Sequence, residues 1–397
     1  MSRFSDDQVD LSVLKNRAFN YRWAELEDGV IPLTAADSDF PVAQEIQDTL
    51  IDYIKDGYLS YTPKLGSKEL RVAIQQHLAV KKNEKVSENN ILPIDSAARG
   101  LFIIAESVLK PGDEAIVFNP VDFLFRHSMK RAGAKLIEYP VKLLDESMDL
   151  SDLESYITPK TKMIGLCNPH NPLGLLYSKE NLQLLLNLAE KHNLYIMNDE
   201  IWSDIIFPEK EFISILAVDP DKNDRVLSVY GFSKAFSIAG LRVGCVYCDN
   251  QELFDKMVEV SCVMSTAGGV SSLSQVAATA CLTKAGPWLE SFMEHLSTMR
   301  DYACARINKM PNINCRTPEA TFLIYADIRK FAISSEEFCD FMKERVKLAL
   351  VPGGAYFFGS ESEGFIRICF STSKAILEEG LNRLESGITM LLEEKVK

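Results

Sequence analysis

Residues 229–244 read Val-Tyr-Gly-Phe-Ser-Lys-Ala-Phe-Ser-Ile-Ala-Gly-Leu-Arg-Val-Gly and place one lysine between a β-rich run and a glycine-rich turn. Lys234 stands where a strand should end, and its small neighbours leave room for a flat ring to approach. An amine held in this way can form an imine with an aldehyde. Arg242, eight residues further on, can anchor an acidic group. The segment therefore predicts a strand of an α/β sheet that leads into a reactive site.

The surrounding chain has the pattern of a parallel sheet covered by helices. From about residue 64 to residue 287, short β-rich runs alternate with amphipathic segments of helical period. One such helix should be capped by Ser178 and run through His192. The clearest strands are expected at 115–118, 162–167, 194–197, 226–230 and 243–247. We therefore expect an α/β large domain with a mostly parallel central sheet.

A second, smaller domain is predicted beyond residue 288. A long helix-like stretch over 289–309 leads into strand-like segments at 320–325 and 365–370 and an amphipathic segment at 375–392. We expect three parts in all. These are an N-terminal segment that packs on the small domain (1–45), a large domain that binds the cofactor (46–288) and a small α+β C-terminal domain (289–397).

Composition excludes several classes of protein. The chain of 397 residues carries 43 basic and 56 acidic residues, a net charge of −13, which argues against nucleic acid as a partner. Its start lacks the apolar core of a signal peptide, and no run reaches the roughly 18 to 20 apolar residues of a membrane span. Among nine scattered cysteines, Cys245 and Cys248 form a Cys-x-x-Cys, but this segment is typical of a strand, in which the two side chains face opposite ways. The five histidines do not pair at a metal-ligand spacing. We expect a cytoplasmic protein without a metal site or membrane partner.

Polar residues follow or interrupt the predicted strands in a way that suits one cofactor. Asp199 comes just after the strand at 194–197, and Asn171 follows the strand at 162–167 within Cys-Asn-Pro-His-Asn-Pro-Leu-Gly. Open α/β sheets bind ligands at such strand ends. Pyridoxal 5'-phosphate needs a carboxylate at its ring nitrogen, a donor to its phenolic oxygen and a cradle for its phosphate. The spacing therefore indicates this cofactor, held as a Schiff base on Lys234.

These motifs resemble the class I/II aminotransferases, which belong to the fold-type I pyridoxal phosphate enzymes. The resemblance runs from about Leu33 to the C-terminal helix and implies the fold of that family. It implies that Lys234 is the catalytic base and that Asp199 keeps the ring nitrogen protonated. It also implies that Asn171 donates to the phenolic oxygen near the substrate, and that Arg367 binds the substrate carboxylate through two parallel hydrogen bonds.

The resemblance also implies a phosphate cradle and a partner subunit. The cradle would combine Arg242, the Ser233 hydroxyl and the backbone amides of Ser96, Ala97 and Ala98 at a helix start. Ala98 and Gly231 stand where relatives often have threonine and serine. Tyr61 resembles a tyrosine that reaches the phosphate from the neighbouring subunit, which implies a homodimer with shared active sites. The alternative is a turn tyrosine that packs under a helix.

Three further positions are matched by the resemblance. Ala36 lies where a substrate-contacting glycine is usual. Trp202 replaces a tyrosine or histidine that donates a hydrogen bond to the phenolic oxygen, so this bond should be missing. Phe123 is the candidate for the aromatic side chain that stacks on the cofactor ring, and Asp122 is the other residue that can hold this aligned position.

Two reactions fit the site. Segments 36–41, 167–172, 199–204, 286–289 and 318–323 resemble the cystathionine β-lyase-like, carbon–sulfur lyase branch. The run Gly240–Gly244 is more similar to ordinary aminotransferases. We expect transfer of an amino group between an L-amino acid and a 2-oxo acid. The alternative is a β-lyase that releases thiol, pyruvate and ammonia. A third hypothesis is a regulatory protein that binds the cofactor without turnover.

The sequence also bears on the choice of substrate. Dicarboxylate-specific relatives contribute an arginine from the segment that corresponds to residues 261–275. No arginine occurs in this segment here. Aspartate and glutamate are therefore less expected as amino donors.

Overall fold

The computed structural model describes residues 3–144 and 147–396, which form two compact units. The larger unit comprises Val42–His170 and Leu175–Leu289. The smaller unit comprises Met1–Pro41, Asn171–Gly174 and Glu290–Lys397. The sequence did not indicate that Asn171–Gly174, four residues from the middle of the predicted large domain, would group with the smaller unit.

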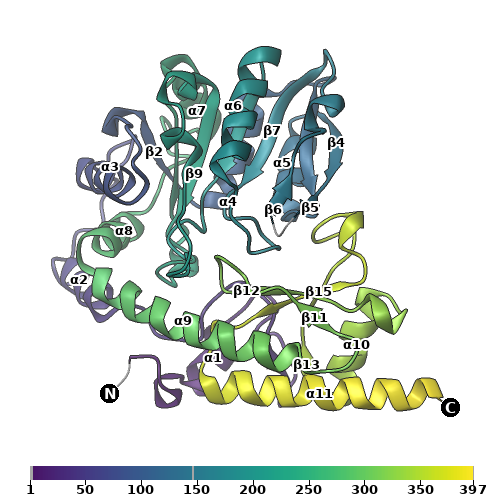
Figure 1. Ribbon diagram of the computed structural model, residues 1–397. Helices are drawn as coiled ribbons and strands as arrows, with labels where there is room; N and C mark the ends of the chain where they lie inside the picture. The colour runs from purple at the N-terminus through teal and green to yellow at the C-terminus, as the bar shows by residue number, and fades with distance from the viewer. Residues whose placement is uncertain (1–2, 145–146, 397) are drawn as a thin grey trace. The chain divides into compact units, whose positions relative to one another are not determined.

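The larger unit is built on a seven-stranded sheet with the order β2-β10-β9-β8-β7-β3-β4 (Figure 1). Strands β9, β8, β7, β3 and β4 run parallel to one another. Strand β10 is antiparallel to both of its neighbours. The strands are β2 (Ile91–Ile94), β3 (Glu114–Asn119), β4 (Lys135–Pro140), β7 (Thr161–Cys167), β8 (Tyr195–Asp199), β9 (Val226–Gly231) and β10 (Gly244–Tyr247). The predicted α/β class with a mostly parallel sheet is confirmed.

Helices pack against this sheet. Helix α4 contacts β8, β9 and β10, α5 contacts β3 and β4, and α6 contacts β8. The Ser178 hydroxyl caps α6, which ends at His192, because it accepts a hydrogen bond from the Asn181 amide at 3.2 Å. The helices are α2 (Gln44–Lys55), α3 (Lys68–Lys82), α4 (Ala97–Val108), α5 (Phe123–Arg131), α6 (Lys179–His192), α7 (Gln251–Ser261) and α8 (Ser272–Lys284). A separate pair of antiparallel strands consists of β5 (Lys142–Leu144) and β6 (Ser147–Asp149).

The smaller unit has a four-stranded antiparallel sheet with the order β11-β12-β15-β14, and a two-stranded parallel pair of β1 and β13. Figure 1 shows α11 in yellow beside these strands. The elements are α1 (Leu11–Arg17), β1 (Ile31–Pro32), α9 (Gly286–Ile307), which begins in the larger unit, β11 (Asn314–Cys315), β12 (Leu323–Asp327), α10 (Ser335–Val346), β13 (Leu348–Ala349), β14 (Val351–Pro352), β15 (Phe365–Cys369) and α11 (Lys374–Val396).

One strand of the smaller unit begins later than predicted. The sequence favoured a strand over 320–325, whereas β12 starts at Leu323. Thr321 adopts a φ of 70°, a left-handed conformation that a strand residue cannot have. The local backbone therefore turns before the ladder begins. Among the described residues, no helix is long and apolar enough to cross a membrane.

Candidate active site

Lys234 lies three residues beyond the end of β9, in the larger unit. Its side chain is half-buried. The Nζ atom lies 5.6 Å from the ring centroid of Trp202, which is itself only 2% exposed. An aromatic face at this distance favours a cation over it only weakly, and it keeps water from one side of the amine. Lys234 is therefore a partly desolvated lysine close to the carboxyl end of β9.

Asp199 is the last residue of β8 and pairs with Val229 on the neighbouring β9. The residue is buried, and its Oδ1 atom accepts a hydrogen bond from the Ile201 amide at 3.0 Å. Burial raises the pKa of this carboxyl to about 7, and the nearby carboxyls of Asp122 and Glu200 act in the same direction. A carboxyl in this state can share a proton with a basic ring nitrogen.

The N-terminus of α4 is held very close to the ends of β9 and β10. A Cβ atom on Gly244 would lie 2.7 Å from the Ala97 amide nitrogen, and one on Gly231 would lie 2.9 Å from the Ala97 Cβ atom. Ser96 is the N-cap residue, and its hydroxyl accepts a hydrogen bond from the Arg99 amide at 3.2 Å. Glycine at both positions therefore permits this approach. The sequence placed the anion-binding amides of 96–98 at a helix start, and α4 begins at Ala97.

The other predicted cradle residues lie in the segment between β9 and β10. Ser233 is half-buried. Arg242 is exposed and has a φ of 50°, directly after a short 3-10 helix over Ala239–Leu241. Its guanidinium is thus accessible to an anion. The Ser237 hydroxyl in the same segment is buried and has no hydrogen-bond partner among the described residues.

Asp122 and Phe123 occupy different structural positions at the start of α5. The Asp122 carboxylate caps the helix and accepts a hydrogen bond from the Leu124 amide at 3.0 Å. Phe123 is half-buried, and its ring meets that of His127 edge-on at a centroid distance of 5.1 Å. Asp122 also lies near enough to Asp199 to raise its pKa.

The smaller unit brings Arg367 and Asn171 together. Arg367 lies on β15 and is buried. Its Nη1 atom donates to the Asn171 side-chain oxygen at 3.3 Å, and Nη2 donates to the Thr34 carbonyl at 3.5 Å. The guanidinium carbon lies 5.1 Å from the centroid of the Phe358 ring. A buried guanidinium with long hydrogen bonds can readily exchange them for a carboxylate.

Ala36 lies in a turn whose backbone carbonyls accept hydrogen bonds from a buried arginine, Arg22. Arg22 donates to the carbonyls of Ala35 and Asp37 at 3.0 and 2.8 Å and forms an ion pair with Asp39. Arg22 and Asp39 are 2% and 3% exposed. The sequence did not indicate these contacts of Arg22, because Arg22 lies outside every motif from which we inferred a site residue.

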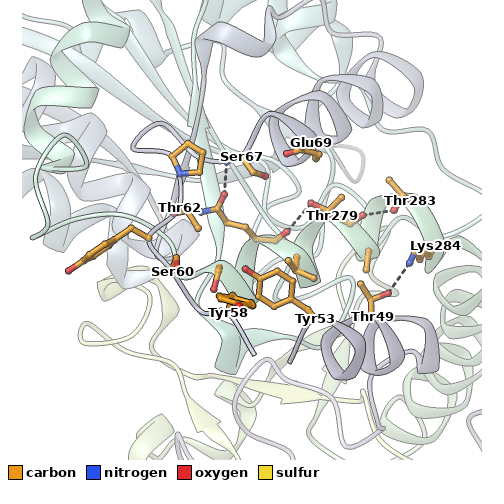
Figure 2. Close-up of a pocket in the computed structure, with 16 residues that line it drawn as sticks. Thr49, Tyr53, Tyr58, Ser60, Thr62, Ser67, Glu69, Thr279, Thr283 and Lys284 are labelled. Carbon is orange, nitrogen blue, oxygen red and sulfur yellow. Dashed lines mark hydrogen bonds between the residues drawn. The ribbon is translucent and has the colours of Figure 1, made fainter. Parts of the chain in front are cut away.

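Tyr61 lies in the loop between α2 and α3 and is 90% exposed. The alternative in which it packs under a helix is therefore wrong for this chain. The same loop borders a cavity of about 560 Å³ lined by α2, the start of α3 and α8 (Figure 2). Tyr53, Tyr58, Gln275 and Val276 are among its lining residues.

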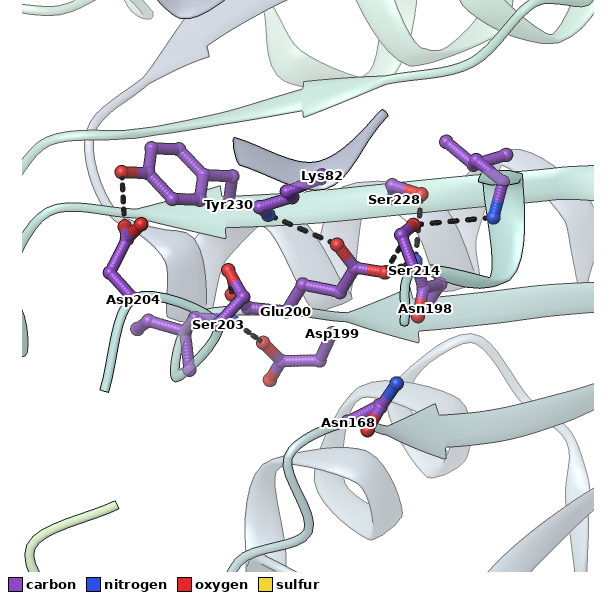
Figure 3. A network of polar contacts seen from close by, with 12 residues as sticks. Lys82, Asn168, Asn198, Asp199, Glu200, Ser203, Asp204, Ser214, Ser228 and Tyr230 are labelled. Atoms are coloured by element: carbon purple, nitrogen blue, oxygen red, sulfur yellow. Dashed lines mark hydrogen bonds and ion pairs between the residues drawn. The ribbon is translucent and has the colours of Figure 1, made fainter. Parts of the chain in front are cut away.

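A buried charge network behind Asp199 was not predicted (Figure 3). The Lys82 ammonium lies 3.0 Å from the Glu200 carboxylate, and both side chains are at most 1% exposed. The Asp204 carboxylate bonds to His77 at 2.9 Å and accepts from the Tyr230 hydroxyl at 2.7 Å. Lys82 lies at the end of a helix of mixed polarity, so its burial had no sequence signal. Only the adjacency of Glu200 to Asp199 could have drawn attention to it.

The residues of the larger unit fit pyridoxal 5'-phosphate in their chemistry. The buried Asp199 carboxyl has a pKa of about 7, suited to a protonated ring nitrogen, and lies on the strand next to the one that leads to Lys234. The amides that begin α4 suit a phosphate group. Among the described residues, no group of three or more His, Cys, Asp and Glu side chains could hold a metal ion.

Comparison with known proteins gives a consistent result. The sequence profile described as "Aminotransferase class I and II" matches residues 28–384. An aspartate aminotransferase of Thermotoga maritima is 30% identical over 90% of this chain and 91% of its own length. The cystathionine beta-lyase PatB of Bacillus subtilis is 27% identical, with coverages of 90% and 92%. A PLP-bound putative aminotransferase from Clostridium difficile 630 is similar in structure, with a TM-score of 0.87, 27% identity and coverages of 94% and 97%.

Proposed function

The chain belongs to the class I and II aminotransferase family of pyridoxal phosphate-dependent enzymes, and on this basis we propose that it transfers the amino group of an L-amino acid to a 2-oxo acid with Lys234 as its catalytic residue. The main support for the proposal is that β8 and β9 are neighbouring strands and that each leads to one of the two candidate residues. The buried Asp199 ends β8, and Lys234 follows the adjacent β9.

The cofactor, when bound, supplies an aldehyde that takes up the substrate's amino group and a ring that accepts electrons from the substrate's Cα atom. Asp199 would hold the proton on the ring nitrogen, because its buried carboxyl can share a proton near neutral pH. The Lys234 amine takes the proton from the substrate's Cα as general base. Trp202 shields one side of this amine, at 5.6 Å from its ring centroid.

Arg367 orients the substrate. Its buried guanidinium can bind the substrate carboxylate through two parallel hydrogen bonds, with Asn171 beside it at 3.3 Å. Ala36 lies in the turn that Arg22 holds, and we propose that this turn contacts the substrate. Without an arginine in 261–275 to pair with a second carboxylate, aspartate and glutamate are less expected as amino donors.

We assign the phosphate group of the cofactor to the N-terminus of α4. The amides of 96–98 lie at the start of the helix, where the helix dipole favours negative charge and free amides can bind an anion. Ser233 and the exposed Arg242 would complete the cradle. Phe123 is the side chain that we propose for stacking on the ring.

We propose a homodimer in which Tyr61 reaches the partner's site. Tyr61 and its neighbours form an exposed apolar surface next to the cavity of Figure 2. Exposed apolar surface of this kind marks an interface more often than a free surface. The large apolar side chains that are exposed in this surface are Ile51, Ile54, Tyr58, Leu59 and Tyr61.

A reducing compartment suits the thiols of this chain. The nine cysteines are all free, and only Cys262 among them is exposed. Free thiols persist where glutathione and thioredoxin keep cysteine reduced. We therefore propose the cytoplasm as the place of action.

A second candidate function is carbon–sulfur β-lysis, since a cystathionine beta-lyase is similar over 90% of this chain. Both reactions use Lys234 to remove the Cα proton, and they differ only in the step after this proton transfer. Expulsion of a thiolate from the β-carbon, followed by hydrolysis with one water molecule, gives thiol, pyruvate and ammonia. A transfer leaves the bond to the β-substituent intact and yields the 2-oxo acid of the amino donor.

The test is a screen of L-amino acids by their effect on the absorbance of the bound cofactor, together with product analysis. With 2-oxoglutarate present, an amino donor should yield its 2-oxo acid and glutamate. Pyruvate and free thiol from L-cystathionine, without transfer to any 2-oxo acid, would replace our proposal by the lyase. A cofactor spectrum that no amino acid changes would instead favour the regulatory binding protein.

A further inference from the structure

Three ionisable side chains are buried together behind the turn that carries Asp199. Counted over whole residues, Lys82, Glu84 and Glu200 are 4%, 1% and 0% exposed. Lys82 ends α3, Glu84 follows this helix, and Glu200 directly follows β8. Figure 3 shows Lys82 and Glu200 turned toward each other, with the Asp199 side chain directed elsewhere. The proposed reaction uses none of these three groups.

The two carboxyls of the cluster differ in their hydrogen bonds. Glu200 accepts from Lys82 at 3.0 Å, from the Asn198 amide group at 2.9 Å and from the Ser214 hydroxyl at 2.8 Å. Three donors, one of them charged, stabilise a carboxylate. By contrast, neither oxygen of Glu84 has a hydrogen-bond partner of normal geometry among the described residues. An unpartnered buried oxygen is far more tolerable on a neutral acid than on an anion.

The charges of the cluster lead to the same conclusion. One ammonium can neutralise one carboxylate, so ionisation of both Glu84 and Glu200 would leave a buried net negative charge. Asp204, a third carboxyl near Lys82, offers no compensation, because His77 lowers its pKa to about 2 despite its burial. Burial and the nearby Glu200 carboxylate raise the pKa of Glu84 well above its usual value, although Lys82 opposes this. The Tyr247 hydroxyl and the Cys245 thiol also face Glu84, and burial raises the pKa of each of them, so they stay neutral. Glu84 is therefore the group that holds a proton.

The Glu200 backbone ties this cluster to both proposed catalytic strands. Its amide donates to the Val229 carbonyl of β9 at 3.0 Å. Its carbonyl accepts from the Ser203 amide at 3.1 Å and the Ser203 hydroxyl at 2.7 Å. The turn thus formed includes Ile201, whose amide donates to Asp199. Fixing the Glu200 side chain fixes the backbone from which the Asp199 carboxyl projects.

We propose that the Lys82–Glu200 ion pair is a positioning element for Asp199, and that Glu84 keeps the cluster neutral as a protonated acid. The inference rests on the proposed function, because it concerns how the enzyme holds the carboxyl for the cofactor's ring nitrogen. Lys82 and Glu200 act through Asp199 and touch no reacting atom.

Two matched substitutions test the proposal, because Glu84→Gln and Glu200→Gln make the same chemical change in one cluster. Glu84→Gln replaces a neutral acid by a neutral amide, so the affinity for pyridoxal 5'-phosphate and the pH midpoint of the bound cofactor's absorbance should match the wild type. Glu200→Gln removes the anchor, and the affinity should fall roughly 10-fold or more. The pH midpoint should shift as well, which loss of fold stability alone would not cause.

A measurement without cofactor tests the proton directly. The infrared difference spectrum of cofactor-free wild type minus Glu84→Gln should show the carbonyl band of a buried carboxylic acid at neutral pH. Asp199, whose pKa is also raised, contributes to both proteins and cancels in the difference. If Glu200→Gln fails to fold, Lys82→Gln/Glu200→Gln takes its place, since it leaves no unpaired buried charge. The same loss of affinity is expected for this double variant.

The outcomes separate the parts of the proposal. Wild-type affinity and midpoint in both Glu200→Gln and the double variant would overturn the positioning role. Absence of the acid band from the difference spectrum, or a midpoint in Glu84→Gln shifted as in Glu200→Gln, would overturn the assignment of the proton. Failure of the wild type to bind the cofactor would refute the proposed function instead.

Discussion

At the scale of the residue, the unusual feature is a buried carboxyl that forms no ion pair with any of the described residues. Asp199 accepts a hydrogen bond from the Ile201 amide, and its pKa is raised to about 7 by burial and by its acidic neighbours. We propose that a protonated ring nitrogen, when bound, offsets the energy that this burial costs in the cofactor-free protein. A carboxyl whose pKa is perturbed in this way is typical of a functional site.

Replacement of Asp199 by asparagine should flatten the pH dependence of stability. The carboxyl pKa is about 7 in the folded protein against a usual value of 3.8, so the folded state binds the extra proton. Its contribution is present below pH ~4 and falls by up to about 1.4 kcal/mol per pH unit toward pH 7. Urea denaturation of the cofactor-free proteins across this range measures the difference between wild type and Asp199→Asn. Parallel curves would contradict the raised pKa.

Lys234→Ala should bind pyridoxal phosphate without the absorbance band of the lysine-linked cofactor. Loss of the general base alone should reduce turnover by roughly 10² to 10⁴-fold. Absorbance spectra and steady-state rates measure both effects. Lys330→Ala is the control, because this lysine is exposed in the smaller unit and lies outside the proposed site. An unchanged spectrum and rate in Lys234→Ala would refute the assignment.

Arg367→Ala should weaken substrate binding more than it slows turnover. Loss of a buried charge pair costs roughly 2 to 5 kcal/mol, and the loss should appear mainly as a raised KM. Arg329→Ala removes an exposed arginine from the same unit and should leave KM unchanged. Equal KM values for wild type and Arg367→Ala would show that another group binds the carboxylate.

At the scale of the element, the site depends on how closely one helix approaches two strand ends. The N-terminus of α4 reaches β9 and β10 because glycine stands at 231 and 244. The amides of 96–98 thereby come near the segment that contains Lys234. A helix dipole contributes to anion binding only near the first turn of the helix. The short distance between the start of α4 and the ends of β9 and β10 is therefore important for binding a phosphate.

Gly244→Ala should displace the start of α4. The new methyl group would lie 2.7 Å from the Ala97 amide nitrogen, and such overpacking typically costs about 1 to 3 kcal/mol. The affinity for pyridoxal phosphate should fall more than that for pyridoxal, since only the former uses the phosphate cradle. Gly286→Ala is the control because no atom lies within 4 Å of its added Cβ. Equal losses for both ligands would argue against a cradle at α4.

At the scale of the whole molecule, we propose that a second copy of the chain completes the site. Tyr61 is 90% exposed, and Tyr58 and Leu59 beside it in the chain are exposed too. Two identical surfaces related by a two-fold axis would cover each other and carry Tyr61 into the partner's site. Oligomeric state and catalysis should therefore be linked.

Hybrid dimers can show whether Tyr61 acts across the interface. Lys234→Ala and Tyr61→Ala should each have low activity alone. After mixing and reassortment, half of the dimers are hybrids with one intact shared site, so activity should recover to about a quarter of the wild-type value. Mixtures that gain no activity while exchanging subunits would place Tyr61 in its own subunit's site. Size-exclusion chromatography of differently tagged subunits verifies the exchange.

Much of the fold was accessible from the sequence because its signals are local. The five predicted strands of the larger unit correspond to β3, β7, β8, β9 and β10, and α6 has the predicted cap and end. Hydrophobic period and capping residues act within a few positions, so they can be read directly. The strand at 320–325 was placed too early because the left-handed Thr321 has no such local signal.

The α/β class, the family and the candidate residues for the chemistry could all be inferred from the sequence, because motifs such as the one around Lys234 join residue type to strand position. The surroundings of these residues became visible only in the folded chain. Lys82, Glu84 and Glu200 are ordinary surface residue types, and their burial follows from how α3 and β8 pack. Desolvation and proximity set the charge of Asp199 and Glu84, and neither quantity exists before the chain has folded.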